Sequence, residues 1–572
     1  MTLASVEQRR TALAGRMPQW QPSTLDRVLA RMAGEFADRP YVLTDEVQWS
    51  YAEVQDRAER FASGLAQIGV KPGDRVALLM ANYAEFVPLA YAVWRLGATL
   101  IPMNFAFRAT ELGYVLKQSA ARVLITMSEF RGLNYCAMLD QLAPGWERDA
   151  SAAFPNLKAV VLFGATSRAT ERQAMTTDQL LASGANKTAP ANPTQATDPA
   201  VIMYTSGTTG LPKGVLQSHD NVLRISYALA YHQAYREGRR TVFALPLYHA
   251  FGLVVGVIAS IWVGGAIVPQ MLFDPVATFA GIEKFKATDG LFVPTMAMAL
   301  IEHPDQTRYD LSSLTGVLSG AAPTPASVWK RLIEALGLEE AFTGYGMTEL
   351  SCATVLTASG DSLELLERTV GRIIDAGAAG LPEHRGLIGQ YKTCDPYSGE
   401  LLADGEEGEL VFKGPTATKG YFGRPDETAV LFLKDGWLRS GDLGRIRPDG
   451  YIELTGRSKE LYKTGGELVA PKEVEAVLDQ HPDVAQSYVI GVPDDKWGEI
   501  GAAWVVPKPG AKPKPEELAQ FCAERLAKYK WPRHVFLIDA ESLPKTPTAK
   551  VQKFELVKMA VARLKEAARK SA

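Results

Sequence analysis

The chain has 572 residues, of which 47% are hydrophobic and 22% are charged, and its formal net charge at pH 7 is −3. This length exceeds what a single hydrophobic core organises, so we expect about three or four structural units. The near-neutral charge balance argues against a nucleic-acid partner, because nucleic-acid binders carry basic stripes. The four cysteines lack metal-ligand spacing, which argues against a zinc site and favours reduced thiols in a cytoplasmic protein.

One uncharged stretch, residues 250–269, is long enough to span a bilayer. It contains four glycines, and the pair Gly264-Gly265 separates a helix-like half from a short strand-like run. We therefore expect a buried helix followed by a buried strand, and no membrane span. The N-terminus also lacks the apolar core of a signal peptide.

Strand-like apolar runs alternate with helical patterns through the first 300 or so residues. Such alternation predicts βαβ units around a parallel sheet. The first block has predicted strands at 76–80, 98–102, 123–125 and 159–163 and a helix over 84–96. After a small, polar surface connection, 183–199, the second block has predicted strands at 200–204, 241–245 and 290–293 and a helix from Ser218.

The pattern changes twice in the second half of the chain. After about residue 355, short runs between Gly, Asp and Pro predict a small antiparallel, β-barrel-like unit. From Glu460 onward we expect a compact α+β segment, with helices over 471–480 and 515–529 and strands over 486–492 and 502–506. The predicted fold class is α/β, with an N-terminal domain over 1–456 (α/β subdomains at about 1–190 and 200–350, a β-rich subdomain at 355–456), a hinge at 457–460 and a mobile α+β C-terminal domain over 460–572.

The most informative segment is the loop Thr205–Gly214, TSGTTGLPKG, which follows the predicted strand 200–204. Its glycines allow close approach to a ligand, and its amides and hydroxyls are donors suited to phosphate oxygens. Lys213 adds a positive charge. The Walker form requires G-x-x-x-x-G-K-[ST], whereas here Gly207, Gly210 and Lys213 stand three residues apart. The loop therefore predicts a polyphosphate site unlike that of P-loop kinases and GTPases; a flexible Ser/Gly linker is the alternative.

Four further segments follow the loop: Tyr345 to Glu349 (YGMTE), Ser440-Gly441-Asp442, Leu454 to Glu460 (LTGRSKE) and Pro544 to Lys550 (PKTPTAK). Each alone has an ordinary interpretation, as a helix cap, a turn, a charged linker or solvated surface lysines. Together and in this order, they resemble the motifs of the AMP-forming, acyl-activating superfamily, which includes acyl-CoA synthetases, adenylation domains of peptide synthetases and luciferases. The resemblance extends from about residue 25 to 558.

The resemblance implies a role for each motif. Glu349 is implied to help hold Mg²⁺, Asp442 to bind the ribose hydroxyls, and Lys550 to stabilise negative charge as pyrophosphate leaves. Lys459 corresponds to the hinge of the family. The implied catalytic residues are Lys550, Thr205, Glu349 and His249, and the implied ATP-binding residues are Thr205, Ser206, Gly207, Thr208, Thr209, Lys213, Gly320, Ala321, Ala322, Tyr345 (adenine stacking), Gly346, Met347, Thr348, Asp442, Arg457 and Lys550.

The resemblance also concerns the acid and the thiol. Pro246 to His249 resembles the loop that gates the acyl pocket of the family, and Gly346 stands where acetate-specific relatives have a bulky indole, so we expect an acid larger than acetate. Ser440 and Ala549 depart from the usual Thr and Gly of the family. The implied acyl pocket comprises His249, Gly252, Gly256, Ala321, Gly344 and Gly346, and Gly465, Gly466 and Glu467 are implied to border the CoA tunnel.

These implications amount to a two-step ligase that joins a monocarboxylic acid (medium-chain, branched, cyclic or aromatic) to CoA at the expense of ATP. A stand-alone adenylation enzyme that loads a carrier protein is the nearest alternative. A luciferase-type oxygenase and a catalytically inactive nucleotide-binding regulator are more distant ones. The sequence leaves a homodimer open.

Overall fold

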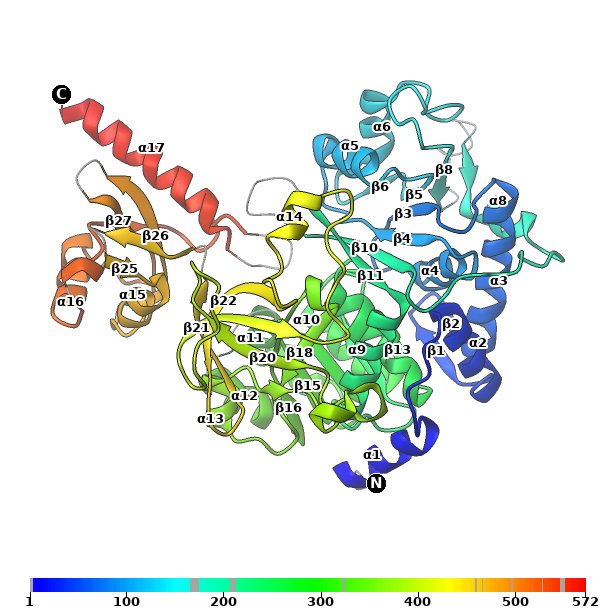
Figure 1. Cartoon of the computed structure of the whole chain (residues 1–572), viewed down its shortest axis with the longest axis horizontal. Coiled ribbons are helices and arrows are strands. Elements are labelled where there is room, and N and C mark those ends of the chain that lie inside the picture. The colour runs from blue at the N-terminus through cyan, green and yellow to red at the C-terminus, as the bar shows by residue number, and fades with distance from the viewer. Residues whose placement is uncertain are drawn as a thin grey trace. The chain divides into compact units, whose positions relative to one another are not determined.

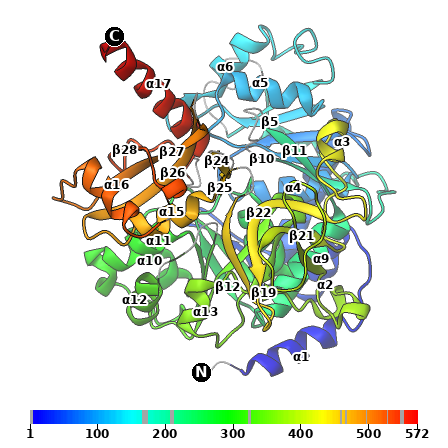
Figure 2. The ribbon, with the colours of Figure 1, turned by 60° about the vertical axis from the view of Figure 1, so that its left-hand side comes forward.

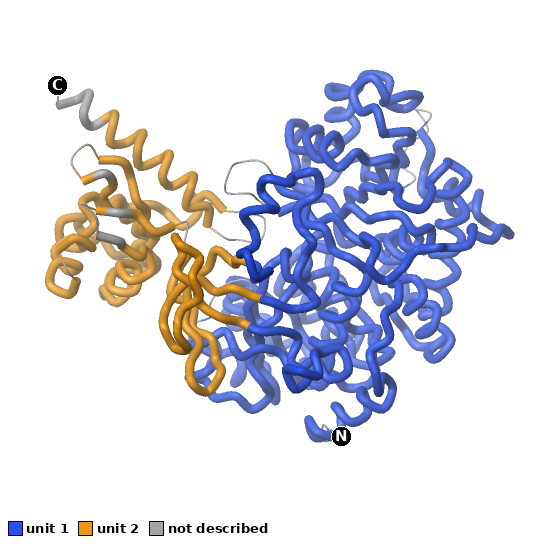
Figure 3. The backbone as a smooth tube through the Cα atoms, in the orientation of Figure 1, with its two compact units in different colours: residues 1–390, 413–438 blue, residues 391–412, 439–572 orange. Residues whose placement is uncertain are grey.

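The computed structural model describes most of the chain. It divides into two compact units (Figure 3): unit 1 comprises Met1–Gln390 and Lys413–Leu438, and unit 2 comprises Tyr391–Phe412 and Arg439–Ala572. The predicted domain boundary at residue 456 falls inside unit 2. The described residues are 4–164, 174–205, 212–320, 324, 326–457, 460–464, 467–494, 497–526, 528–545 and 551–571.

Unit 1 contains a seven-stranded sheet, here called sheet A, in the order β16-β15-β14-β12-β13-β1-β2. All its neighbouring strands are parallel except β1 and β2, which form an antiparallel pair. The strands are β1 (Pro40–Leu43), β2 (Gln48–Ser50), β12 (Arg240–Phe243), β13 (Ala266–Pro269), β14 (Asp289–Phe292), β15 (Gly316–Ser319) and β16 (Glu340–Phe342).

The second seven-stranded sheet of unit 1, sheet B, has the order β11-β10-β4-β3-β5-β8-β9. It is parallel apart from β10 and β11, which are antiparallel. β1 and β2 belong to sheet A and β10 and β11 to sheet B, so the predicted ranges 1–190 and 200–350 do not coincide with the two sheets. The strands are β3 (Arg75–Leu79), β4 (Thr99–Pro102), β5 (Val123–Met127), β8 (Ala159–Phe163), β9 (Met175–Thr176), β10 (Pro199–Thr205) and β11 (Lys213–Ser218).

Most helices of unit 1 bury apolar residues, whereas α14 has no buried residue, and α4 is buried over nearly its whole length. Figures 1 and 2 both show α5 and α6 side by side, where Gly113 of α5 lies against Leu142 of α6. The helices are α1 (Val6–Arg16), α2 (Leu25–Glu35), α3 (Tyr51–Gln67), α4 (Phe86–Arg95), α5 (Ala109–Gln118), α6 (Tyr135–Leu142), α8 (Thr177–Ser183), α9 (His219–His232), α10 (Pro275–Phe285), α11 (Pro294–Glu302), α12 (Ala326–Leu336), α13 (Leu363–Arg368) and α14 (Pro425–Ala429).

The uncharged stretch 250–269 is buried and forms a helical segment followed by β13, as predicted. The helical part is not an α-helix: it is a π-helix, η1 (Phe251–Ile258), continued by a 3₁₀-helix, η2 (Ala259–Val263). Across the described part of the chain, no helix combines the length and apolar composition needed to cross a membrane.

The β-rich region contains two open sheets. β17 (Gly344–Met347), β18 (Cys352–Leu356) and β19 (Arg372–Ile373) form an antiparallel sheet in unit 1. β20 (Gln390–Cys394), β21 (Gly408–Lys413), β22 (Leu438–Ile446) and β23 (Ile452–Arg457) follow one another in a second sheet. The described strands of this region do not close into a barrel. Of the barrel-like prediction, only the short strands joined by tight turns are found.

The C-terminal part of unit 2 is a sheet with helices on both faces (Figures 1 and 2). Val489 and Ala503 pack with α15 and α16, whereas the next residues, Ile490 and Trp504, pack with α17. This period-two alternation explains how one pair of strands has two apolar faces. The elements are β24 (Tyr462–Thr464), β25 (Glu467–Val469), α15 (Pro471–Leu478), β26 (Val484–Asp494), β27 (Gly498–Pro507), α16 (Pro515–Ala523), β28 (His534–Leu537) and α17 (Lys553–Ser571).

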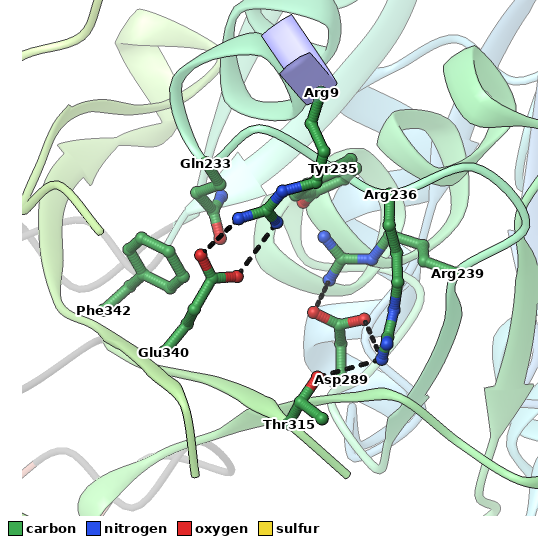
Figure 4. Close-up of a pocket in the computed structure, with 9 residues that line it drawn as sticks. All are labelled: Arg9, Gln233, Tyr235, Arg236, Arg239, Asp289, Thr315, Glu340 and Phe342. Carbon is green, nitrogen blue, oxygen red and sulfur yellow. Dashed lines mark hydrogen bonds and ion pairs between the residues drawn. The ribbon is translucent and has the colours of Figure 1, made fainter. Parts of the chain in front are cut away.

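A cluster of charged side chains lies at the amino ends of the strands of sheet A (Figure 4). Arg9 of α1 forms a bidentate ion pair with Glu340, the first residue of β16, at 2.6 and 3.1 Å. Arg239 Nη2 lies 3.4 Å from Asp289 Oδ1, and Arg236 donates to Thr315 Oγ1 at 3.0 Å. These residues surround a cavity of about 10 Å³, which has room for about one water molecule. The cluster therefore attaches α1 to sheet A at the amino ends of its strands, away from their carboxyl ends.

Candidate active site

The predicted phosphate loop connects two antiparallel strands. Thr205 is the last residue of β10 and pairs with Lys213, the first residue of β11. A Walker loop leads from a strand into a helix, whose N-terminus faces the phosphates. Here a strand follows instead, and α9 begins only after Ser218, whose hydroxyl caps it by accepting from Asn221 N at 3.1 Å. Ser206, Gly207, Thr208 and Thr209 lie outside the described residues, so their roles stay predictions.

The segment 418–422 runs along β11. Leu216 N donates to Gly420 O at 3.0 Å, and Phe422 N donates to Gly214 O at 2.8 Å. This pairing brings Tyr421 beside the end of the loop, where Lys213 Nζ lies 5.1 Å from the centre of the Tyr421 ring. Nothing in the sequence pattern singled out Tyr421.

The same tyrosine contacts the carboxylate predicted to hold the metal. Tyr421 Oη donates to Glu349 Oε1 at 2.8 Å, and Thr418 N donates to the backbone oxygen of Glu349 at 2.7 Å. Gln217 of β11, also missed by the sequence pattern, donates to Thr348 O at 2.8 Å. Thr348 and Glu349, which follow β17, are therefore held beside the strand that leaves the phosphate loop.

The Glu349 site suits a hard cation. The Glu349 side chain provides two carboxylate oxygens, and the residue is 9% exposed. Mg²⁺ prefers oxygen ligands and is often bound by one or two carboxylates together with substrate phosphates and water. The Glu349 carboxylate thus has the chemistry of a Mg²⁺ ligand, and its role as the protein ligand stays a prediction.

The loop after β12 lies at the carboxyl edge of both sheets. Asn82, which follows β3 of sheet B, donates to Leu245 O at 3.0 Å and accepts from Leu247 N at 3.0 Å. His249 Nδ1 accepts from Phe251 N at 3.2 Å. A Cβ on Gly320 would lie 3.3 Å from the Phe251 ring, so the predicted acyl loop and the predicted adenine segment are neighbours. Ala321 and Ala322 lie outside the described residues.

The glycines assigned to the acyl pocket have packing reasons of their own. A Cβ on Gly252 would lie 2.3 Å from Pro246 O, and one on Gly256 would lie 2.7 Å from the Phe243 ring. A Cβ on Gly344 or Gly346 would lie 2.3 or 2.0 Å from atoms of β18. Close approach of neighbouring atoms therefore explains these glycines without a ligand. The geometry at Gly346 gives no independent support for an acid larger than acetate.

The residue predicted to bind ribose is part of a cross-strand ion pair in unit 2. Asp442 of β22 is in register with Arg457 of β23, and Arg457 Nε lies 2.9 Å from Asp442 Oδ1. Asp442 N donates to Ser440 Oγ at 3.0 Å, so the serine hydroxyl is part of this turn. Glu409, another residue that the sequence pattern missed, accepts from Gly441 N at 2.9 Å and pairs with Arg439.

Comparison with known proteins identifies the family. The family model described as AMP-binding enzyme matches residues 29–422, and the model of the AMP-binding enzyme C-terminal domain matches residues 473–550. The chain belongs to the AMP-forming acyl-CoA synthetase family. It is accordingly an acid–thiol ligase with ATP and CoA as co-substrates.

Two relatives and one solved structure illustrate the similarity, each sharing most of its length with this synthetase. A putative acyl-CoA synthetase, YngI, of Bacillus subtilis is 35% identical over 93% of this chain and 96% of its own. A feruloyl-CoA synthase of an Amycolatopsis species is 34% identical over 89% and 93%. The structure of a Mycobacterium tuberculosis fatty acyl CoA synthetase is 28% identical over 94% and 99%, with a TM-score of 0.74.

The C-terminal part of the synthetase contains an ion-pair network around the buried carboxylate of Glu475. Lys553 Nζ lies 2.7 Å from both Glu460 Oε2 and Glu475 Oε1, and Glu475 is also paired with Lys472 at 2.8 Å. Glu475 Oε1 accepts from Val489 N at 2.8 Å as well. The pKa of Glu475 is lowered: burial acts to raise it, but the two lysines outweigh burial. The network connects Glu460, the last residue of the predicted hinge, to the start of α17.

Several predicted residues of this synthetase stay predictions. Lys459, Lys550, Gly465 and Gly466 lie outside the described residues. Glu467 begins β25, and only its backbone is described.

Proposed function

We propose that this synthetase activates a monocarboxylic acid larger than acetate: a medium-chain, branched, cyclic or aromatic one. In the first step the carboxylate of the acid attacks the α-phosphorus of ATP, which forms acyl-AMP and expels pyrophosphate. In the second step the thiol of CoA attacks the acyl carbon and AMP leaves. The names of two relatives, feruloyl-CoA synthase and fatty acyl CoA synthetase, support a range that includes aromatic and aliphatic acids.

The observation that carries this proposal is the convergence of Lys213 and Glu349 on Tyr421. An ammonium and a carboxylate at one place suit a metal–polyphosphate complex, since Lys213 offsets phosphate charge and Glu349 holds the metal. When bound there, Mg²⁺ supplies Lewis-acid stabilisation of the charge on the departing pyrophosphate. Asp442 accepts hydrogen bonds from the ribose, and Lys550 stabilises the charge that develops at the α-phosphate.

The test follows AMP release with ATP and a panel of acids, with and without CoA. AMP release that requires both an acid and CoA supports the ligase. Acid-dependent release of pyrophosphate without release of AMP when CoA is added favours loading of a carrier protein. Absence of any acid-dependent turnover favours the regulator.

A second measurement tests the role of Lys550. We expect Lys550→Ala to abolish acyl-AMP formation but to retain thioester formation from supplied acyl-AMP, because its charge is needed only when pyrophosphate leaves. Equal loss of both half-reactions contradicts this assignment. The hinge at Lys459, the CoA-tunnel residues, a cytoplasmic location and a homodimer stay predictions.

A further inference from the structure

Tyr421 contacts two side chains of opposite charge. Its hydroxyl donates to Glu349 Oε1 at 2.8 Å, and its ring lies 5.1 Å from Lys213 Nζ. The ring face of a tyrosine attracts an ammonium, and a hydrogen bond to a carboxylate is among the stronger ones in proteins. One side chain therefore contacts both the phosphate-loop lysine and the carboxylate assigned to the metal.

In this contact the Tyr421 phenol is the donor and the Glu349 carboxylate is the acceptor. A hydrogen bond at one carboxylate oxygen restricts rotation of the group, which fixes the direction in which the carboxylate meets a cation.

The hydroxyl is not needed to hold its own segment in place. Backbone hydrogen bonds already attach residues 418–422 to β11 and to Glu349, from Leu216 N, Phe422 N and Thr418 N. The side-chain contacts are additional to this pairing. Removal of the hydroxyl should therefore leave the segment in position and change only the carboxylate.

We propose that Tyr421 is a positioning residue, whose hydroxyl orients Glu349 toward the metal and whose ring holds Lys213 toward the polyphosphate. The inference rests on the proposed function in one respect, the assignment of Glu349 to Mg²⁺. It assigns two separable effects to one residue, and two substitutions separate them.

Tyr421→Phe removes the hydroxyl and keeps the ring, whereas Tyr421→Leu removes both. The probes are Mn²⁺, followed by electron paramagnetic resonance, and α,β-methylene ATP, followed by calorimetry in EDTA. We expect Tyr421→Phe to weaken Mn²⁺ binding in the presence of the analogue about tenfold, the equivalent of about 1.4 kcal/mol, with unchanged binding of the metal-free analogue. Tyr421→Leu should weaken both.

The matched control is Tyr51→Phe, which removes a buried hydroxyl that donates to Gly265 O at 2.7 Å. This substitution removes a comparable buried hydrogen bond. It should alter the binding constant of neither Mn²⁺ nor the metal-free analogue. Wild-type Mn²⁺ affinity in Tyr421→Phe overturns the proposal, as does an equal loss in Tyr51→Phe or a wild-type protein that binds no Mn²⁺ with the analogue. Failure of the proposed function is a different result, because it appears as absence of acid-dependent AMP release in the unmodified protein.

Discussion

At the scale of single residues, Asp442 and Arg457 show how one ion pair can prepare a binding group. Asp442 is 8% exposed, whereas the Arg457 side chain is 43% exposed. A buried carboxylate is costly to leave without a partner, and the arginine pairs with it while staying partly hydrated itself. The resemblance assigns the two oxygens of this carboxylate to the ribose hydroxyls, a role that stays a prediction.

We expect Asp442→Asn to raise the KM for ATP by about ten- to a hundredfold, because a hydrogen bond to a charged group contributes about 1.5–3 kcal/mol. The KM for the acid should not change. Arg457 is half exposed and stays solvated without its partner, so the loss of stability should be small. Steady-state kinetics with each substrate varied in turn is the measurement.

Asp449→Asn on the same hairpin is the control, because Asp449 pairs with Arg447 at 2.7 Å on the surface. It should leave both KM values unchanged. A parallel rise in the KM for the acid in Asp442→Asn would argue for a general disturbance of the site.

At the scale of elements, α9 begins and ends with a buried histidine. Burial lowers the pKa of His219 to about 4 and that of His232 to about 3. His219 Nδ1 accepts from Leu25 N, and His232 Nδ1 accepts from Asp375 N, so both rings are held as neutral acceptors. A positive charge near a helix C-terminus is normally favourable, but at His232 the cost of burying the charge outweighs it.

The lowered pKa values of the two histidines make the free energy of unfolding depend on pH. Between about pH 6.5 and 4, the unfolded chain binds a proton at His219 and the native protein does not, so the free energy of unfolding falls as the pH falls. We expect His219→Gln to reduce this slope by up to about 1.4 kcal/mol per pH unit. Urea unfolding at a series of pH values measures it.

The range from pH 7.5 to 9 is the internal control, because His219 is neutral there in both states. The variant and the unmodified protein should show the same slope in that range. An unchanged slope below pH 6.5 in His219→Gln would contradict the assignment.

At the scale of the whole molecule, the two ends of the strands in unit 1 have different roles. The predicted phosphate, metal and acyl groups follow the carboxyl ends of strands, where ligands of open α/β sheets bind. The charged cluster of Figure 4 lies at the opposite, amino ends of sheet A. Its role is attachment: the Arg9 and Glu340 side chains are 7% and 10% exposed, and the two residues are 331 positions apart in the chain.

We expect Arg9→Met to destabilise the protein by about 3–5 kcal/mol, because it leaves the Glu340 carboxylate buried without its arginine. At a temperature where the variant stays folded, its rate of acyl-AMP formation should match that of the unmodified protein, since the site is at the other edge. Urea unfolding and the pyrophosphate assay measure the two effects.

Arg308→Met is the matched control, because Arg308 forms an exposed pair with Asp305; such pairs contribute about 0–1 kcal/mol. Equal destabilisation by the two substitutions would show that the buried pair contributes no more to stability than the exposed pair.

Much of this molecule was predictable from local chemistry. The strands β3, β4, β8 and β10 lie within a residue or two of their predicted ranges, since continuous apolar runs mark buried parallel strands. The helix predicted over 515–529 ends at Ala523, and a separate 3₁₀ turn follows at Lys528–Lys530. Helix ends depend on packing and are the least certain part of such predictions.

Short motifs were enough to predict the family and the reaction, because their glycines, hydroxyls and lysines act over short stretches of chain. Only the tertiary structure decided that β1 joins sheet A, that Gln217 meets Thr348 and that Tyr421 meets Glu349. The last two pairs are 131 and 72 positions apart. Hydrophobic periodicity tells which face of an element is buried, but strand pairing and side-chain packing select its partner.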